Sequence, residues 1–269
     1  MPARPNGSTL RQRVAAATVA GALAVGLVGV GAVVEASPAA ATSPSAPSAV
    51  RQLMTGWLPY WNTSAAVASV TANAELFSDV SPFWFSMRGS APSVTVVDVS
   101  GGVSRSAVTA ALHAKNIPVI PTVTDGTGYR QMSTQLATPA GRSRVVGLLT
   151  NLVTSNGYDG IDLDWEGFAF VDGGSSWSTT RPRWAAFIAS LGTALHARGK
   201  LLAVTAPGGL GTSSDSTGYS VYAWSLIGPY VDRLRIMAYD YHVSGAGPIA
   251  PLPWVEAVVK QAVTQVDAN

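Results

Sequence analysis

The sequence predicts an α/β fold built around a parallel β-sheet, and three observations indicate this. From residue 51 onward, short apolar segments alternate with amphipathic helical segments, which is the order found in βαβ units. Several of the apolar segments are continuous rather than alternating, as expected for parallel strands that helices cover. Six such units between residues 51 and 269 fit either a barrel of eight βα units or an open, doubly wound sheet.

The candidate strands are short apolar runs bounded by turn-forming residues. In chain order they are Gln52–Pro59, Val80–Met87, Ile117–Val123, Gly160–Glu166, Leu201–Ala206 and Arg233–Tyr239. A further run, Val94–Val97, is predicted to add a hairpin strand.

Three of the intervening segments carry helix signals. Ser104 is a suitable N-cap for a helix that reaches about Lys115. Apolar residues at helical spacing predict a second helix from Trp184 to Leu195, which Gly199 would end. The same spacing predicts a third helix over residues 255–266.

The first 50 residues differ in composition from the rest of the chain, because all 8 Trp, 8 Tyr and 6 Phe lie beyond them. Arg11 and Arg13 precede an apolar stretch from Val14 to Val34, and three alanines at 39–41 offer a cleavage site. We therefore expect a secretory signal peptide. A retained membrane anchor is the alternative, since about 20 apolar residues can span a bilayer.

These observations divide the sequence into a signal peptide at residues 1–41, a Pro/Ser/Ala linker at 42–50 and a folded domain at 51–269. We expect the mature protein to be secreted, extracellular or cell-wall-associated, and free of the membrane after cleavage.

The composition excludes several classes of function. The chain has no cysteine, so it has no disulfide, zinc-thiolate site, iron–sulfur cluster or cysteine nucleophile. Without the three Arg and one Glu of residues 1–41, the chain keeps 14 positive and 14 negative side chains. A neutral domain without a basic run argues against nucleic acid as a partner.

The most informative segment runs from Asp159 to Glu166, with the sequence DGIDLDWE. If Asp162, Asp164 and Glu166 lie on one strand, their side chains share a face, because strand side chains alternate. These three residues are called the carboxylate ladder below. Neighbouring carboxylates raise one another's pKa, which is tolerated where a proton must be held near neutral pH.

Three interpretations of the ladder compete. The apolar flanks argue against a solvated acidic surface strand. A Mg²⁺ or Ca²⁺ site is the second interpretation, but calcium loops place Gly and polar residues between their ligands, whereas Ile161, Leu163 and Trp165 stand here. The third is acid catalysis on a glycosidic bond, with Glu166 as proton donor and no metal.

Four segments carry a resemblance to a known family. The DGIDLDWE segment resembles the D-G-x-D-x-D-x-E signature of glycoside hydrolase family 18, the chitinases and their relatives. Met237-Ala-Tyr239-Asp240 resembles the family's M-x-Y-D at the sixth barrel strand. Residues 56–61 resemble the aromatic end of its first strand, and 206–207 its fifth. The resemblance implies a catalytic domain of (β/α)8 TIM-barrel type, with about six βα units in this chain.

The resemblance also implies roles for individual residues. Glu166 would protonate the leaving oxygen, while the substrate's own 2-acetamido carbonyl attacks the anomeric carbon. Asp164 would hold the acetamido N–H and share a proton with Asp162. The Tyr239 hydroxyl would bond the acetamido oxygen. Asp159 looks like a support residue.

Substrate-binding roles are expected for residues around these acids. Asp240 and Met237 would line the floor of the subsite. Tyr60, Trp61 and Trp84 lie near strand ends, where sugar rings could stack on them. Trp57 is expected in the core instead.

The implied substrates are chitin, chitooligosaccharides and other polymers of β-1,4-linked N-acetylglucosamine, since a sugar without the acetamido group lacks the internal nucleophile. We therefore expect a monomeric, cofactor-free glycosidase. A peptidoglycan or spore-cortex N-acetylglucosaminidase is the runner-up, and a non-hydrolytic chitin-binding lectin is the alternative outside the enzymes.

Two departures from the family's pattern stand out. Thr122 to Gly126 replaces the S-x-G-G pattern that usually ends the third strand. Residues for a seventh and eighth βα unit are missing, and with them the Trp that floors the catalytic subsite, so we expect a barrel truncated after its sixth unit.

Overall fold

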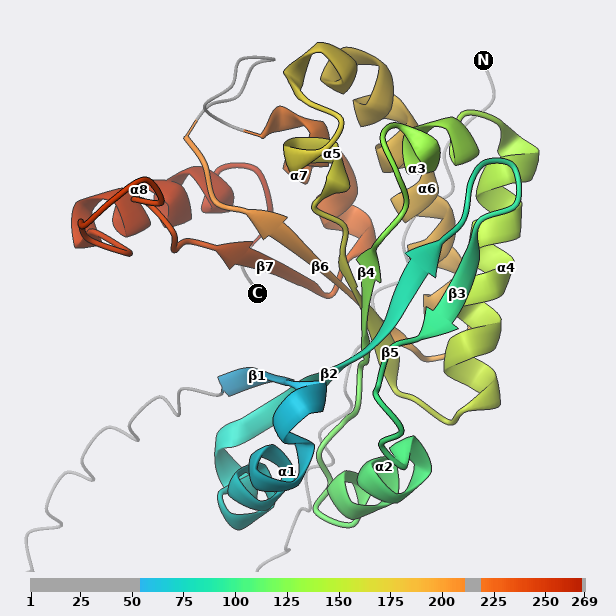
Figure 1. The fold of residues 1–269 in the computed structure, drawn as a ribbon, viewed down its shortest axis with the longest axis vertical. Coiled ribbons are helices and arrows are strands. Elements are labelled where there is room, and N and C mark those ends of the chain that lie inside the picture. Colours follow the sequence, from blue (N-terminus) through green and yellow to red (C-terminus); the bar gives the residue numbers. More distant parts are fainter. Residues whose placement is uncertain (1–53, 211–218, 268–269) are drawn as a thin grey trace, which may run out of the picture. The chain divides into compact units, whose positions relative to one another are not determined.

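The computed structural model describes residues 54–210 and 219–267. The predicted signal peptide at 1–41 and linker at 42–50 lie outside the described residues, as do residues 52 and 53 of the first predicted strand. Figure 1 shows the described chain as a curled sheet with helices on its outer side.

The sheet has six parallel strands in the order β1-β2-β4-β5-β6-β7, and β3 pairs antiparallel with β2. The strands are β1 Met54–Leu58, β2 Phe77–Arg88, β3 Thr95–Asp98, β4 Thr122–Asp125, β5 Gly160–Asp164, β6 Leu201–Pro207 and β7 Arg233–Met237. The expected parallel α/β architecture with about six units is therefore confirmed, and β3 forms the predicted hairpin strand.

The curl of the sheet follows from one contact. β2 and β7 are four positions apart in the strand order, so a flat sheet would separate them by roughly 19 Å. Nevertheless, Arg235 Nη2 on β7 lies 2.6 Å from Asp79 Oδ1 on β2. Only a strongly curved sheet brings these side chains together, which favours the half-barrel over the open, doubly wound alternative.

The described residues form more helices than the three that the sequence predicts. They are α1 Thr63–Ala72, α2 Arg105–His113, α3 Gln131–Gln135, α4 Pro139–Ser155, α5 Gly167–Phe170, α6 Trp177–His196, α7 Trp224–Ile227 and α8 Leu252–Val263. The helices α2, α6 and α8 match predictions, although α6 begins before Trp184. The longest helix without a prediction is α4, which starts with Pro139 at its first position and has Gly141 N–H donating to Thr138 Oγ1.

Several strand boundaries differ from the prediction. β2 begins at Phe77 rather than Val80, and β7 ends at Met237 rather than Tyr239. The third apolar run, Ile117–Val123, forms regular strand only from Thr122, and Val119 makes a single bridge to Val80. The ladder strand β5 ends at Asp164, so Glu166 lies two residues past its end.

The outer side of β5 rests on an aromatic cluster. The ring of Trp165, directly after the strand, stacks on Phe187 of α6 at 5.1 Å between centroids and an interplanar angle of 8°. Phe168 and Trp184 pack against the same ring, and the Tyr222 hydroxyl donates to the Trp165 carbonyl. Burial of each such side chain contributes about 1.5–3 kcal/mol, so this cluster holds the end of β5 in place.

The opposite, N-terminal ends of the strands carry two similar contacts. His113 ends α2 and bonds Asp159, which precedes β5. His196 ends α6 and bonds Asp232, which precedes β7. These two contacts, called the His–Asp pairs below, join helix ends to strand starts.

No helix within residues 54–210 and 219–267 combines the length and apolar character needed to span a bilayer.

Candidate active site

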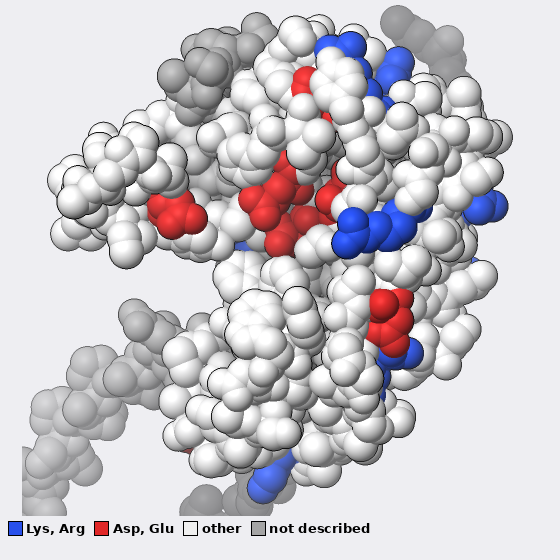
Figure 2. Space-filling model, viewed as in Figure 1, with Lys and Arg blue, Asp and Glu red and all other residues white. Residues whose placement is uncertain are grey.

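The C-terminal ends of β5, β6 and β7 surround a cavity of about 520 Å³. Its lining residues are Glu166, Phe170, Pro207, Gly208, Gly209, Tyr219, Met237, Tyr239, Asp240, Tyr241, Val243 and Trp254. Figure 2 shows acidic side chains gathered in a hollow near the middle of the viewed face. In (β/α) barrels this end of the sheet carries the catalytic residues.

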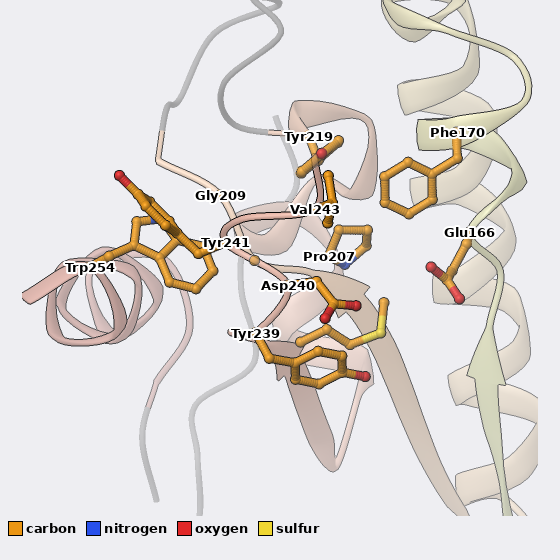
Figure 3. A pocket seen from close by; sticks show the side chains of 12 residues that line it. Glu166, Phe170, Pro207, Gly209, Tyr219, Tyr239, Asp240, Tyr241, Val243 and Trp254 are labelled. Carbon is orange, nitrogen blue, oxygen red and sulfur yellow. The ribbon is translucent and has the colours of Figure 1, made fainter. Parts of the chain in front are cut away.

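Glu166 is half-buried and extends from the segment that joins β5 to α5. In Figure 3 its carboxylate, the Asp240 carboxylate and the Tyr239 hydroxyl all point into the same space. Burial and, next, the charge of Asp240 raise the pKa of Glu166 above its usual value. Such a carboxyl retains its proton at a higher pH, which is the property required of a general acid.

Asp164 ends β5 and is buried, with an exposed fraction of only 6%. Within the described part of the chain, its Oδ1 atom has no hydrogen-bond partner. Burial raises the pKa of Asp164 to about 8, and the charges of Glu166 and Asp162 add to the effect. At neutral pH this carboxyl therefore holds a proton.

Asp162 lies on the same face of β5, fully buried, and has the opposite environment. Three donors hydrogen-bond its two oxygens: Trp57 Nε1 at 3.1 Å, Thr122 Oγ1 at 2.8 Å and Thr205 Oγ1 at 2.9 Å. The guanidinium of Arg235 forms an ion pair with the same carboxylate, with Nη1 3.1 Å from Oδ2.

Tyr239 and Asp240 follow β7 at a sharp bend, where Asp240 takes a left-handed conformation with φ of 57°. Burial and, in turn, the charges of Asp164, Glu166 and Asp240 raise the pKa of Tyr239. Its hydroxyl is therefore a protonated donor. Gly208 permits this arrangement, because a Cβ there would lie 2.8 Å from the Met237 carbonyl oxygen.

The structure brings together the predicted residues Asp162, Asp164 and Glu166 at β5 with Met237, Tyr239 and Asp240 at β7. The expected common face holds for Asp162 and Asp164 on the strand. Glu166 reaches the cavity from the loop beyond it.

One predicted binding residue is wrong. The Trp84 side chain is completely buried and its ring packs 5.9 Å from that of Tyr158, so it has no face for a sugar. Tyr60 and Trp61 are exposed, with their rings edge to face, but they lie outside the lining of the Glu166 cavity. Their contacts with substrate stay predictions.

Sequence reasoning missed several residues of the site. Trp57, expected in the core, is 38% exposed and donates to Asp162. Arg235 was assigned no role. Its signal was available, because Arg233 and Arg235 alternate with apolar residues along β7 and therefore share the face of Met237.

Across residues 54–210 and 219–267, no group of three or more His, Asp or Glu side chains is arranged to hold a metal ion.

A half-buried acid beside a second acid of raised pKa, at the C-terminal end of a parallel barrel sheet, is the arrangement expected of a glycoside hydrolase. Comparison with known proteins identifies the family of glycoside hydrolases. The sequence model of the glycosyl hydrolases family 18 matches residues 64–268, so the chain belongs to this family.

The relatives of this chain include both chitinases and sporulation proteins. "Putative sporulation-specific glycosylase YdhD" of Bacillus subtilis (strain 168) is 29% identical over 136 residues, covering 50% of this chain and 30% of that protein. Chitotriosidase-1 of Mus musculus is 31% identical over 124 residues, covering 44% of this chain and 25% of its own length.

Among solved structures, a chitinase from Chromobacterium violaceum matches with a TM-score of 0.66 at 24% identity, covering 80% of this chain and 65% of that one. At this identity the match shows the fold alone. This chain spans less than a third of either sequence relative.

Proposed function

We propose that this protein is a secreted glycosidase that hydrolyses β-1,4-linked N-acetylglucosamine polymers, with chitin or chitooligosaccharides as substrates. The observation that carries the proposal is the pairing of Glu166, which opens onto the cavity, with Asp164, which is buried beside it and whose pKa is raised by burial and by the charge of Glu166. Membership of a glycosyl hydrolase family and similarity to a mouse chitotriosidase support it.

In the proposed reaction, Glu166 donates its proton to the glycosidic oxygen as the bond from that oxygen to the anomeric carbon breaks. The carbonyl oxygen of the substrate's 2-acetamido group attacks the anomeric carbon and forms an oxazolinium ion. Glu166, now a carboxylate, takes a proton from water, which opens the ion with net retention of configuration.

Two side chains would hold the acetamido group during these steps. The free Oδ1 atom of Asp164 can accept the acetamido N–H, which would satisfy a buried oxygen that otherwise has no partner. The protonated hydroxyl of Tyr239 can donate to the acetamido oxygen. Met237 and Asp240 would form the floor beside them.

A second candidate is a peptidoglycan or spore-cortex N-acetylglucosaminidase, which the similarity to a sporulation-specific glycosylase favours. The chemistry would be the same, because peptidoglycan also contains N-acetylglucosamine. We therefore treat chitin and purified cell-wall sacculi as the two substrates to compare.

Export is part of the proposal. The arginines at 11 and 13, the apolar stretch and the alanines at 39–41 support cleavage before Thr42. We propose that the mature protein acts outside the cell as a monomer. N-terminal sequencing of the secreted product should begin at Thr42, and an intact N-terminus in the membrane fraction would overturn this part.

The decisive experiment is the variant Glu166→Gln in the complete protein, with a fluorogenic chitooligosaccharide as substrate. The amide keeps the shape of the side chain but cannot donate the proton, so we expect turnover to fall by at least ~10²-fold while substrate binding persists. Glu75→Gln is the matched control, since Glu75 is exposed and outside the cavity lining.

Equal hydrolysis by wild type and Glu166→Gln would overturn the assignment. Faster release of reducing sugars from sacculi than from chitin would transfer the proposal to the second candidate. Activity should survive a chelator, and loss that Mg²⁺ restores would favour the metal interpretation.

A further inference from the structure

Beneath the carboxylate ladder lies a group of buried charges that the reaction above does not use. β7 sends two arginines into the inside of the half-barrel, because Arg233 and Arg235 are two residues apart and share one face of the strand. The Arg235 side chain is only 9% exposed, and the Asp79 side chain on β2 is fully buried.

Asp79 is held by both arginines. Arg233 Nε lies 2.7 Å from Asp79 Oδ2, and Arg235 Nη2 lies 2.6 Å from Asp79 Oδ1. Arg235 Nη1 also donates to Ser81 Oγ at 2.6 Å. Asp79 and Ser81 therefore fix the guanidinium of Arg235 on the β2 side.

The same guanidinium reaches the ladder on its other side. Arg235 Nη1 lies 3.1 Å from Asp162 Oδ2, and the group stands 5.8 Å from the centre of the Trp57 ring, which donates to that same oxygen. Arg235 thus links Asp79 to Asp162 through the inside of the half-barrel.

The charges of this network balance. Two guanidinium groups face two carboxylates, those of Asp79 and Asp162. The two carboxylates are fully buried and the Arg235 side chain nearly so, and each of these buried charges depends on its partner, whereas the Arg233 side chain is 34% exposed. Asp164 stands outside the network, since within the described residues no cation pairs with it.

We propose that Arg235, fixed by Asp79, is a positioning residue that keeps Asp162 ionised and so places the single proton of the Asp162–Asp164 pair on Asp164. The three hydrogen-bond donors and the Arg235 guanidinium around Asp162, and the unpartnered Oδ1 of Asp164, fit this assignment. Its catalytic consequence rests on the function proposed above, whereas the proton assignment does not.

The remaining titratable groups around the pair are acids and phenols. Glu166 faces Asp164 from the β5–α5 segment, Asp240 and Tyr239 come from the end of β7, and the buried Tyr222 lies behind. Asp125 at the end of β4 completes the set. Among the described residues that face the ladder, the arginines of β7 are thus the cations that can hold one carboxylate ionised.

The test locates the proton directly, without any enzymatic assay. The chain is labelled with ¹³C at its aspartate carboxyl carbons, and the signals are assigned with Asp162→Asn and Asp164→Asn. At pH 6 we expect Asp162 to give a carboxylate signal and Asp164 a carboxylic acid signal. A proton on Asp162 in the wild type would overturn the proposal before any arginine is changed.

The variant Arg235→Met then removes the charge while keeping an apolar stem of similar length. We expect Asp162 to gain acid character at the expense of Asp164, whereas Arg235→Lys should retain most of the wild-type pattern. Arg142→Met is the matched control, because Arg142 bonds the Leu136 carbonyl in another part of the fold. An unchanged pair of signals in folded Arg235→Met would overturn the proposal.

Circular dichroism reports whether each variant folds. If Arg235→Met does not, the double variant Asp79→Asn with Arg235→Met removes one buried charge of each sign and is tested in the same way. In the complete enzyme, Arg235→Met should lower kcat by at least about 10-fold with little change in KM. If the NMR result holds but the wild type hydrolyses no N-acetylglucosamine polymer, the proton assignment stands and the proposed function fails.

Discussion

Asp159 and Asp164 stand at opposite ends of the same short strand and have opposite environments. Asp159 accepts the Val119 N–H at 2.8 Å and contacts His113 Nε2 at 2.7 Å. Asp164 has one oxygen with no partner in the described structure and a pKa raised to about 8. In barrels of this type the N-terminal ends of the strands serve stability and the C-terminal ends serve catalysis. Asp159 lies at the first of these ends of β5 and Asp164 at the second.

The comparison shows that the loss of stability caused by the site is confined to the C-terminal ends of the strands. The N-terminal ends of the strands repeat one stabilising device, since the pair His196–Asp232 also captures a strand N–H, that of Leu202. At the C-terminal ends, burial and neighbouring charge raise the pKa of both Asp164 and Glu166. The fold therefore loses stability at Asp164 and Glu166, where the proposed reaction needs a carboxyl group that holds a proton.

The largest expected effect concerns Asp164→Asn. Because the folded-state pKa of Asp164 is raised, the native state binds a proton that the unfolded state has lost. Its contribution to stability is therefore complete below about pH 4 and is lost as the pH rises to about 8. Asn does not titrate, so the variant should lose this slope and be more stable than wild type at pH 8.

Urea unfolding at pH 5, 6, 7 and 8 measures the difference. Asp159→Asn is the matched change at the other end of β5, and it should destabilise the protein by about 1 kcal/mol because it weakens two contacts. Equal pH slopes for wild type and Asp164→Asn would contradict the assignment of a protonated Asp164. On substrate, Asp164→Asn should lower turnover although it stabilises the fold.

The second prediction tests how tightly the N-terminal end of β5 is packed. A Cβ at Gly160 would lie 2.3 Å from the Leu201 carbonyl oxygen on the neighbouring strand β6. We expect Gly160→Ala to cost about 1–3 kcal/mol of stability, since the backbone of a paired strand cannot move aside easily. Gly147→Ala is the control, because no atom lies within 4 Å of its added Cβ and alanine favours the helix by up to ~1 kcal/mol.

The midpoint temperature of thermal unfolding should therefore fall for Gly160→Ala and rise for Gly147→Ala. Stabilisation by Gly160→Ala would show that β5 and β6 separate at this end. Activity per folded molecule should stay at the wild-type level in both variants, since neither glycine lies in the cavity lining.

Much of this arrangement could be predicted from the sequence, because it depends on local patterns. Alternation placed Asp162 and Asp164 on one face, and the resemblance to the family's M-x-Y-D segment placed Met237, Tyr239 and Asp240 at the end of the next-but-one strand. The parallel sheet followed from the order of apolar runs and helices.

What could not be predicted depends on contacts across the inside of the half-barrel. Trp84 was expected near a strand end, but β2 extends on both sides of it and its side chain lies in the core. Trp57 and Arg235 reach Asp162 from strands that are not its neighbours in the sheet order. The curvature of the sheet decides these contacts, and no short sequence pattern encodes it.

The smallest expected effect comes from the His–Asp pairs. His113→Gln and His196→Gln should each cost about 0.5–1.5 kcal/mol, because each removes one side-chain contact while the Asp keeps its bond to a backbone N–H. The two pairs share no residue, so the double variant should show the sum of the single losses in urea unfolding. A loss well above the sum would show that the two strand ends unfold together, and a fall in kcat would show that the two ends of the barrel are coupled.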